Sequence, residues 1–433
     1  MGKESWVKTR LADLCDSVEY GFTQAATDVP EGPKFLRITD IVKEIVDWDE
    51  VPYCQVEPAT AQKYRLHHGD IVIARTGAST GCSAYINHPP RAVFASYLIR
   101  LRINERADSR FISYFLKSPK FWKYIESVRG DKSAQPNASA KTLTQVELDL
   151  PPLEEQRAIS SILASLDEKI ELNHKMNITF EQIAQTLFKR WFVDFEFHGK
   201  EGEPLESSLG AMRDPNIRFM PKEWELKRLG DVVAINAKRI GKDYPFETIE
   251  YVDISSVKAG YLLNTKRYEL KDAPSRAQML VSHGDTIWSA VRPNRKSFLF
   301  INNPSANLVV STGFVVLTPN KIRPCYLYYW VTTDEFVNYL SSNADGSAYP
   351  AVRPNHFAEA LIVVPDEYRL NLFEQSVEPL RNKITENEQE NIILRDIRDM
   401  LMHGLMSGLL VGRRSTLAGT FARANRVFTS KRS

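Results

Sequence analysis

The sequence has few cysteines and no long apolar run. Its 433 residues include four cysteines, at positions 15, 54, 82 and 325, and no two of them form a CxxC pair. Structural zinc sites need clustered ligands and disulfide scaffolds need dense cysteines, so we expect reduced thiols in a cytoplasmic protein. The first residues lack the apolar run of a signal peptide, and no stretch reaches the roughly 18 uncharged apolar residues of a membrane span.

The sequence also has almost no net charge. It carries 56 basic and 54 acidic residues, a formal net charge of +2. This balance excludes a polybasic coat protein and an acidic solvating tail, but it does not exclude a local basic groove. Charged residues make up 25% of the chain and aromatic residues 10%, which is typical of a globular protein with two or three domains at this length.

The usual catalytic motifs are missing as well. The chain has no GxxxxGK[ST] phosphate loop, no GxGxxG after a strand and no GxSxG elbow. His67, His68 and His283 precede Gly-Asp pairs, and no ligand spacing recurs around them, so we interpret them as turn residues. We therefore expect no catalytic centre, no metal site and no cofactor in this chain.

What the sequence does contain is one plan repeated twice. Each copy begins with short strand-like runs separated by turn residues, followed by a helical pair, a proline and a long helix. The offsets between matched segments are 218, 215, 214 and 214 residues. The matched segments are Trp6–Leu14 with Trp224–Val232, His68–Ile71 with His283–Thr286, Ser133–Pro136 with Ser347–Pro350, and Lys169–Ile170 with Lys383–Ile384.

The two long helices carry matching heptad seams with a polar centre. Apolar residues recur at alternating spacings of four and three, and two asparagines interrupt each seam. The first seam is Ile159, Leu163, Leu166, Ile170, Asn173, Asn177, Phe180, Ala184, Leu187 and Trp191. The second is Phe373, Val377, Leu380, Ile384, Asn387, Asn391, Leu394, Arg398, Leu401 and Leu405. Only Arg398 breaks the apolar pattern.

The asparagines leave the direction of pairing open. Antiparallel helices would pair Asn173 with Asn391 and Asn177 with Asn387, whereas parallel helices would pair Asn173 with Asn387. Pseudo-two-fold symmetry favours the antiparallel pair, although each helix could instead pack only on its own globular half. The first seam would span about 48 Å at 1.5 Å per residue, long enough to separate two DNA half-sites about 34–36 Å apart.

Two polar loops recur in each copy and provide the candidate binding residues. Their arginine, asparagine and hydroxyl side chains are the types that contact guanine, adenine and phosphates. Because the loops recur at matching places with different residues, we favour two related recognition surfaces over ordinary solvated loops. The candidates are Arg75, Thr76, Gly77, Ser79, Thr80, Lys132, Ser133, Gln135 and Asn137 in the first copy, and Arg292, Asn294, Arg295, Lys296, Ser347, Tyr349, Arg353 and Asn355 in the second.

This order of segments resembles the specificity (S) subunit of type I restriction–modification systems. The resemblance covers about residues 5 to 411. One departure is the second helix, which begins Pro365-Asp366-Glu367-Tyr368 where the first has Pro-Leu-Glu-Glu-Gln. The residues that carry the resemblance are Leu150–Ile159, Gly69–Gly81, Pro221–Trp224 with Leu229–Asp231, and Met402–Leu410.

The resemblance implies an α+β fold and a non-catalytic DNA-recognition role. It implies two strand-rich target recognition domains, related by a pseudo-two-fold axis and separated by two helices that form an antiparallel coiled coil. Each domain would recognise one half of a split double-stranded DNA sequence. The expected segments are 1–152 for the first recognition domain, 153–197 for the first helix, 205–365 for the second domain, 366–411 for the second helix and 412–433 for a basic, disordered tail.

The resemblance also implies the partners. Methyltransferase (M) subunits, two of them, would dock on the helices, and restriction and translocation (R) subunits would join the complex. S-adenosylmethionine, ATP and Mg²⁺ would be bound by those partners. From the residues themselves we expect the aromatic stretch Phe188–Phe197 to be part of a docking surface, with packing onto the following linker as the alternative. An assembly scaffold without sequence-specific DNA recognition remains the competing function.

Overall fold

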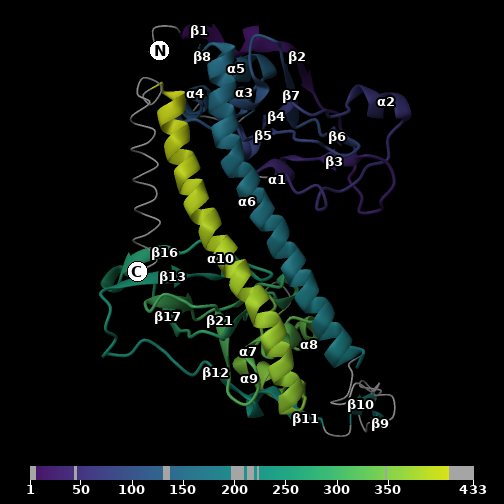
Figure 1. Cartoon of the computed structure of the whole chain (residues 1–433), viewed down its shortest axis with the longest axis vertical. Helices are drawn as coiled ribbons and strands as arrows, with labels where there is room; N and C mark the ends of the chain where they lie inside the picture. The colour runs from purple at the N-terminus through teal and green to yellow at the C-terminus, as the bar shows by residue number, and fades with distance from the viewer. Residues whose placement is uncertain are drawn as a thin grey trace. The chain divides into compact units, whose positions relative to one another are not determined.

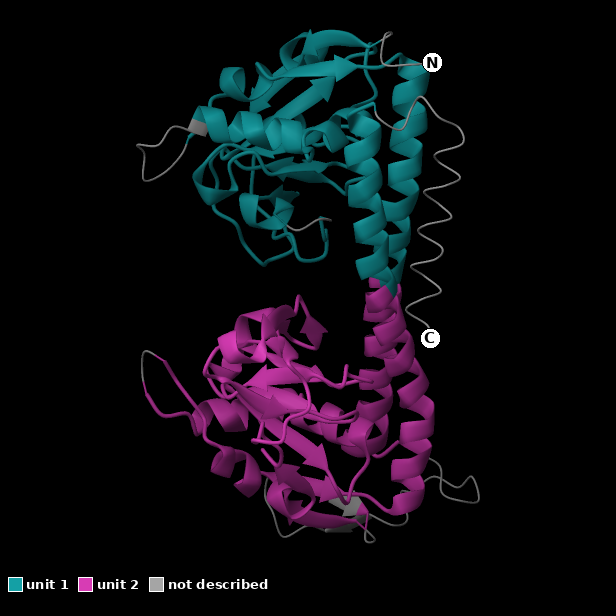
Figure 2. Ribbon diagram, turned by 90° about the vertical axis from the view of Figure 1, so that its left-hand side faces the viewer, with its two compact units in different colours: residues 1–173, 390–433 teal, residues 174–389 magenta. Residues whose placement is uncertain are grey.

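The computed structural model describes residues 6–42, 46–129, 137–196, 209–211, 219–221, 224–346 and 349–408. The chain forms two compact units, coloured separately in Figure 2. Unit 1 comprises residues 1–173 and 390–433, and unit 2 comprises residues 174–389. The long helices α6 (Leu153–Phe188) and α10 (Glu367–Met406), labelled in Figure 1, each contribute one segment to unit 1 and one to unit 2.

Unit 1 is built on a four-stranded antiparallel sheet in the order β2-β7-β4-β5. Strands β3 and β6 form a parallel pair, and β1 pairs antiparallel with β8. The strands are β1 (Val7–Arg10), β2 (Cys15–Tyr20), β3 (Lys34–Leu36), β4 (Ile71–Ala74), β5 (Ser83–Tyr85), β6 (Ala92–Phe94), β7 (Leu98–Ile103) and β8 (Glu147–Leu150). The short helices are α1 (Ile38–Ile41), α2 (Pro58–Lys63), α3 (Ser109–Phe115), α4 (Pro119–Arg129) and α5 (Ala140–Thr144).

Unit 2 repeats this plan and adds strands. Its sheet β12-β21-β18-β19 corresponds to β2-β7-β4-β5, and a parallel pair, β13 with β20, is extended by β16 and β17. The main strands are β11 (Glu225–Arg228), β12 (Val233–Ile235), β13 (Thr248–Val252), β16 (Lys266–Glu269), β17 (Ala277–Leu280), β18 (Thr286–Ser289), β19 (Phe298–Phe300), β20 (Leu308–Ser311), β21 (Phe314–Pro319) and β22 (Leu361–Val364). Two hairpins, β9 (Leu209–Ala211) with β10 (Phe219–Pro221) and β14 (Val257–Lys258) with β15 (Tyr261–Leu262), and the helices α7 (Pro324–Val331), α8 (Asp334–Ser342) and α9 (Pro354–Glu359) complete it.

The strand registers of the two units also correspond. Ile71 lies opposite Leu101 in unit 1, and Thr286 lies opposite Leu317 in unit 2, at offsets of 215 and 216 residues. A shift of one residue would turn every side chain to the other face of the sheet. The matching register therefore keeps corresponding positions buried in both units and corresponding loops at the strand ends.

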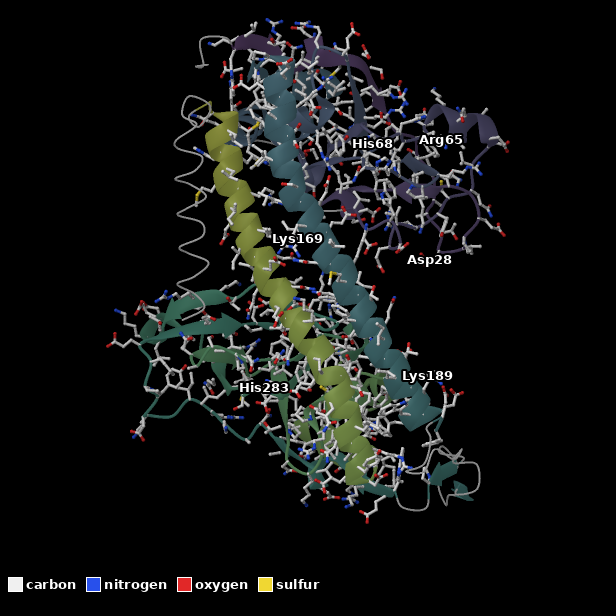
Figure 3. The ribbon with its side chains drawn as sticks, in the orientation of Figure 1. Asp28, Arg65, His68, Lys169, Lys189 and His283 are labelled. Atoms are coloured by element: carbon white, nitrogen blue, oxygen red, sulfur yellow. The ribbon has the colours of Figure 1, made fainter. Side chains whose placement is uncertain are left out.

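The helix segments of unit 1 pair antiparallel. Asn173 of α6 donates from Nδ2 to Asn391 Oδ1 at 2.9 Å, and Asp167 lies 2.9 Å from Arg398, so residue numbers rise along one helix as they fall along the other. Lys169, labelled in Figure 3, donates to Asn173 Oδ1 at 2.8 Å and pairs with Glu390 at 3.1 Å.

The helix segments of unit 2 pair in the same way. Asn387 donates from Nδ2 to Asn177 Oδ1 at 2.7 Å. The antiparallel prediction is thus confirmed, and the parallel alternative is wrong. Every residue of both seams is buried or half-buried, including Arg398, whose guanidinium is held by Asp167. Helix α10 also continues through Pro379, which lacks the backbone N–H of an interior helical residue.

The aromatic stretch that begins at the last residue of α6, Phe188, packs inside unit 2, so the expectation of a docking surface there is wrong. Phe188 and Phe192 are buried, and their rings lie 6.0 and 5.1 Å from the ring of Phe373 on α10. Trp224 and Tyr326 join the same core cluster. Phe197 lies outside the described residues. The density of aromatic rings in this stretch is explained by the core of unit 2, where the end of α6 packs against α7, α10 and the strands.

Candidate functional site

The strands that lead to the candidate loops begin at one shared turn. Gly69 and Gly284 adopt φ of 90° and 86°, a left-handed conformation that glycine allows. In unit 1 the carboxylate of Asp70 accepts the N–H of His67 at 2.9 Å, and in unit 2 Asp285 accepts the N–H of Ser282 at 2.7 Å. Each turn thus fixes the start of the strand, β4 or β18, whose far end carries the candidate loop.

The histidines beside these turns have structural partners. Nδ1 of His68 accepts the N–H of His88 at 3.4 Å, and Nδ1 of His283 accepts the N–H of Asn303 at 3.3 Å. Figure 3 labels His68 in unit 1 and His283 in unit 2. His88 and Asn303 both adopt positive φ, 41° and 43°. The interpretation of His68 and His283 as turn residues is confirmed.

In each unit a backbone junction brings the two candidate loops together. In unit 1 Thr76 forms a β-bridge with Asn137, and the N–H of Ala138 donates to the carbonyl of Arg75 at 2.9 Å. The corresponding bonds in unit 2 join Val291 to Ala351, and Val352 N–H to the Ala290 carbonyl at 2.8 Å. The junctions match at offsets of 214 and 215 residues, so the two loop pairs share one backbone frame.

Unit 1 presents an arginine held by two neighbours. Arg75 donates from Nε to Asn137 Oδ1 at 3.3 Å, and its guanidinium lies 5.0 Å from the ring centroid of Tyr20. The Tyr20 hydroxyl accepts the N–H of Ala140 at 2.8 Å, which ties strand β2 to helix α5. The backbone N–H of Arg75 donates to the carbonyl of Tyr97, a residue that is 58% exposed.

Unit 2 presents an arginine from a different position of the same frame. Arg292 has a left-handed φ of 52°, and its guanidinium lies 4.3 Å from the ring centroid of Tyr349. By the junction offsets, Arg292 corresponds to Gly77, whereas Arg75 corresponds to Ala290. Two further cations of these loops already have carboxylate partners: Lys296 pairs with Asp334 at 2.7 Å and Arg353 with Asp345 at 3.3 Å.

The remaining candidates differ in exposure. Thr80 is fully buried, and its hydroxyl donates to the Gly77 carbonyl at 2.8 Å, so it holds the turn and cannot reach a ligand. Thr76, Gly77 and Ser79 are half-buried, and the exposed candidates are Asn137, Asn294, Arg295, Tyr349, Arg353 and Asn355. Lys132, Ser133, Gln135 and Ser347 lie outside the described residues, as does the basic tail 412–433.

The unit 1 surface also includes two tyrosines that are not among the candidates predicted from the sequence, Tyr20 and Tyr97. Tyr20 lies in β2, 55 positions before the arginine that it contacts, and Tyr97 lies 22 positions after it. Only strand pairing brings them beside Arg75. No local pattern in the sequence marks either tyrosine.

The described residues contain no group of three or more histidine, cysteine, aspartate or glutamate side chains able to hold a metal ion. Within the same part of the chain, none of the helices combines the length and apolar character needed to cross a bilayer. The assignment of cofactors to partner proteins and the cytoplasmic location stay predictions.

Comparison with known proteins identifies the family. The family model of the type I restriction modification DNA specificity domain matches residues 3–182 and 221–372, most of the chain. The chain belongs to this family. The two matched stretches fall on the two copies of the repeat, so each copy corresponds to one specificity domain.

Curated relatives agree with the family assignment. The chain is 26% identical over 318 residues to the type I restriction enzyme MjaIX specificity subunit of Methanocaldococcus jannaschii, covering 70% of this chain and 69% of the relative. It is 23% identical over 463 aligned positions to the HindI specificity subunit of Haemophilus influenzae, covering 93% and 99%. The crystal structure of the S subunit from M. genitalium has a TM-score of 0.55 at 16% identity, covers 92% of this chain and 96% of that one, and supports the fold.

Proposed function

We propose that this specificity-family chain is the DNA sequence-recognition subunit of a type I restriction–modification complex. Unit 1 would recognise one half of a split target and unit 2 the other. The observation that carries the proposal is the repeated loop junction, one backbone frame that presents Arg75 in unit 1 and Arg292 in unit 2. A common frame with different side chains suits two related surfaces that bind different base sequences.

The remaining parts of the proposal concern partners. Methyltransferase subunits, two per complex, would dock on α6 and α10 and carry S-adenosylmethionine. Restriction subunits would carry ATP and Mg²⁺. The exposed apolar side chains on the two helices offer area for such docking: Leu172 and Ile183 on α6, and Ile392 and Met400 on α10, are between 43% and 65% exposed.

A methylome tests the proposal. The chain is co-expressed with the methyltransferase subunit of its own system, and the modified adenines are mapped in the host DNA. A motif of two short specific parts around an unspecific gap is expected. Exchange of residues 205–365 for the matching segment of another specificity subunit should then change one part only. Arg292→Ala should relax the part that this exchange alters, and Arg75→Ala should relax the other.

A coiled-coil scaffold that recognises no DNA sequence gives a different outcome. It would form a stable complex with the methyltransferase subunit but leave no motif in the methylome, and a gel shift at low salt would show no sequence preference. If either arginine substitution weakened both parts of the motif equally, the assignment of one half-site to each unit would be wrong.

A further inference from the structure

Arg75 is the best-supported specificity residue in the described structure because its surroundings define which hydrogen bonds it can still make. Its Nε donor is used by Asn137, at 3.3 Å. Among the residues that the structure describes, the Arg75 side chain has two contacts, the Asn137 oxygen and the Tyr20 ring, with no carboxylate and no hydrogen-bond partner for its two terminal nitrogens. The cation at this loop is therefore held in place without being neutralised.

The contact with Arg75 also fixes what Asn137 can offer. A guanidinium Nε–H only donates, so the Asn137 atom facing it must be the amide oxygen. An asparagine contacts adenine bidentately by using its oxygen and its nitrogen together. Because the oxygen is engaged with Arg75, the exposed side of Asn137 presents its N–H donors. Asn137 thus supports Arg75 and is poorly arranged for adenine.

Together, Arg75 and Asn137 present hydrogen-bond donors on one side. In the major groove only guanine offers two adjacent acceptors, O6 and N7, to a fork of donors. Adenine pairs its N7 acceptor with an amino donor that would repel the guanidinium, and cytosine offers only a donor. The chemistry of the pair therefore selects guanine.

Tyr20 restrains this fork. Its ring lies 5.0 Å from the Arg75 guanidinium carbon, within the range of a cation–π contact. The ring is itself tied down, because the Tyr20 hydroxyl accepts the backbone N–H of Ala140 at 2.8 Å. A guanidinium held against a ring by a cation–π contact has already lost part of its freedom to rotate, so less conformational entropy is lost on binding.

We infer that Arg75 recognises a guanine in the half-site of unit 1, and that Tyr20 is a positioning residue that orients its guanidinium. This inference rests on the proposed function and deepens it, because it names the base and a residue that the sequence did not reveal. Unit 2 is not expected to share the arrangement, since Ala290 stands at the position of Arg75.

The test uses the full chain in complex with its methyltransferase subunits. Once the methylome gives the motif, duplexes are made in which each guanine of the unit 1 half is replaced by 7-deazaguanine, which lacks the N7 acceptor. The matched control is inosine, which keeps O6 and N7 and lacks only the minor-groove amino group. One 7-deazaguanine position should weaken binding about ten-fold or more, and inosine at that position should have little effect.

The decisive comparison repeats this experiment with variants. In Arg75→Ala and Arg75→Lys complexes the 7-deazaguanine penalty should disappear, because the bidentate contact is already lost. Tyr20→Leu should reduce the penalty several-fold, whereas Tyr20→Phe, which keeps the ring and loses only its bond to Ala140, should reduce it less. The base preference of the unit 2 half should stay unchanged in every variant, which shows that the complex is still folded.

Two outcomes would overturn the inference, and they can be told apart. If the 7-deazaguanine penalty is the same in the unaltered and Arg75→Ala complexes, or if the unit 1 half contains no guanine sensitive to this replacement, Arg75 does not recognise guanine although the proposed function stands. If no split motif appears in the methylome at all, the proposed function fails, and the inference fails with it.

Discussion

Asp70 and Asp285 occupy the same position of the same turn but meet different surroundings. In unit 1 Asp70 lies 3.3 Å from Arg102 and 3.8 Å from the fully buried Arg100. In unit 2 the strand register places Thr318 at the position of Arg102 and Val316 at the position of Arg100. Among the described residues, no cation lies within 4 Å of Asp285. Burial accordingly raises the pKa of the Asp285 carboxyl.

At this turn the two units share their backbone and not their charge network. The turn needs an acceptor for one backbone N–H, and both aspartates supply it. The cations around the turn have diverged, because Arg100 and Arg102 have no charged counterparts in unit 2. The same holds at the loop junctions, where the bonds match but the arginines start two positions apart. The shared bonds are therefore the part that the fold requires, and the side chains around them are the part that can specialise.

The helix pairs extend this comparison. In both units an acidic residue of α6 pairs with an arginine of α10, Asp167 with Arg398 and Glu181 with Arg381. Arg398 has a second partner in the exposed Asp399, at 2.9 Å. Arg381 is enclosed by the rings of Phe300 and Tyr328, 5.0 and 4.5 Å away.

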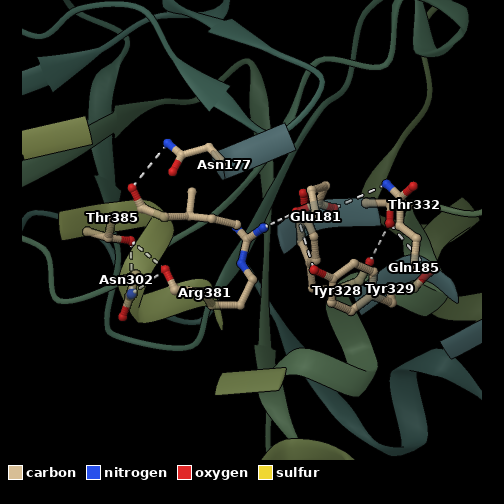
Figure 4. Close-up of polar contacts among 10 residues, drawn as sticks. Asn177, Glu181, Gln185, Asn302, Tyr328, Tyr329, Thr332, Arg381 and Thr385 are labelled. Atoms are coloured by element: carbon tan, nitrogen blue, oxygen red, sulfur yellow. Dashed lines mark hydrogen bonds and ion pairs between the residues drawn. The ribbon is translucent and has the colours of Figure 1, made fainter. Parts of the chain in front are cut away.

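The contacts around Glu181 and Arg381 are shown in Figure 4. Glu181 accepts from Arg381 at 2.6 Å and from the hydroxyl of Tyr329 at 3.3 Å. No second carboxylate lies within ion-pair distance of Arg381 in the described part of the chain. Unit 2 therefore depends on a single acid where unit 1 has two.

The largest expected effect follows from this difference. Glu181→Gln leaves the buried Arg381 charge without a counterion and should lower the free energy of unfolding by about 3 kcal/mol. Asp167→Asn should cost only about 1 kcal/mol, because Arg398 keeps Asp399. Chemical denaturation of the full chain measures both, with Glu386→Gln, which lies in an exposed pair, as the control. Equal costs for Glu181 and Asp167 would contradict the proposed dependence on one acid.

The second effect tests the two aspartates. Asp70→Asn removes a charge beside Arg100 and Arg102 and should cost about 2 kcal/mol. Asp285→Asn should be neutral or stabilising, since the amide oxygen still accepts the Ser282 N–H. The folded-state pKa of Asp285 is raised, so its ionisation opposes folding as pH rises above the unfolded value. The stability of Asp285→Asn relative to the unaltered chain should therefore grow with pH in thermal unfolding. A stability gain that is larger at low pH would contradict the raised pKa of Asp285.

Much of the helix pair could be predicted from the sequence because a heptad seam is local information. Asn173 and Asn177 stand four residues apart, and matching them with the second seam under pseudo-two-fold symmetry predicted the pairs with Asn391 and Asn387. Burial of Arg398 at a seam position was visible as a break in the pattern. Its partner was not, because Asp167 lies off the seam and is identified only by the antiparallel geometry.

The candidate site could be predicted less completely because it is assembled from distant segments. Thr76 and Asn137 are joined by a backbone bridge across 61 positions, which no spacing rule anticipates. The aromatic stretch containing Phe188 was misinterpreted for the same reason, since its neighbours Tyr326 and Phe373 come from segments far along the chain. Thr80 was also misinterpreted. It is a polar residue in a polar loop and was expected to contact a ligand, but the fold buries it.

The asparagine layers provide the third prediction. Asn177→Leu should cost about 1–2 kcal/mol, because Asn387 loses its acceptor, and the double change with Asn387→Leu should recover most of that loss. In unit 1 the double change Asn173→Leu with Asn391→Leu should recover less of the lost stability, because Asn173 also forms hydrogen bonds with Lys169 and Glu390. A double-mutant cycle in each unit measures the difference, and full recovery in unit 1 would show that its wider network adds nothing.

The smallest effect concerns a carboxyl of unit 2, Glu388 on α10. Burial raises the pKa of this carboxyl to about 7. The positive charge of Arg381 acts to lower this pKa, and the negative charge of Glu181 acts to raise it. Folding thus favours the protonated form of Glu388. The folded chain therefore loses stability as the pH rises from 4.5, the pKa of this group in the unfolded chain, to about 7.

Glu388→Gln cannot ionise, so it should be more stable than the unaltered chain above pH 7, by on the order of 1 kcal/mol or a few degrees in Tm. The gain should vanish below pH 4.5, where both side chains are neutral. Thermal unfolding across this range, with Glu386→Gln as the exposed control, decides the matter. A gain that is constant with pH would mean that folding does not shift the pKa of Glu388, and that its carboxyl is as well solvated as one on the helix surface.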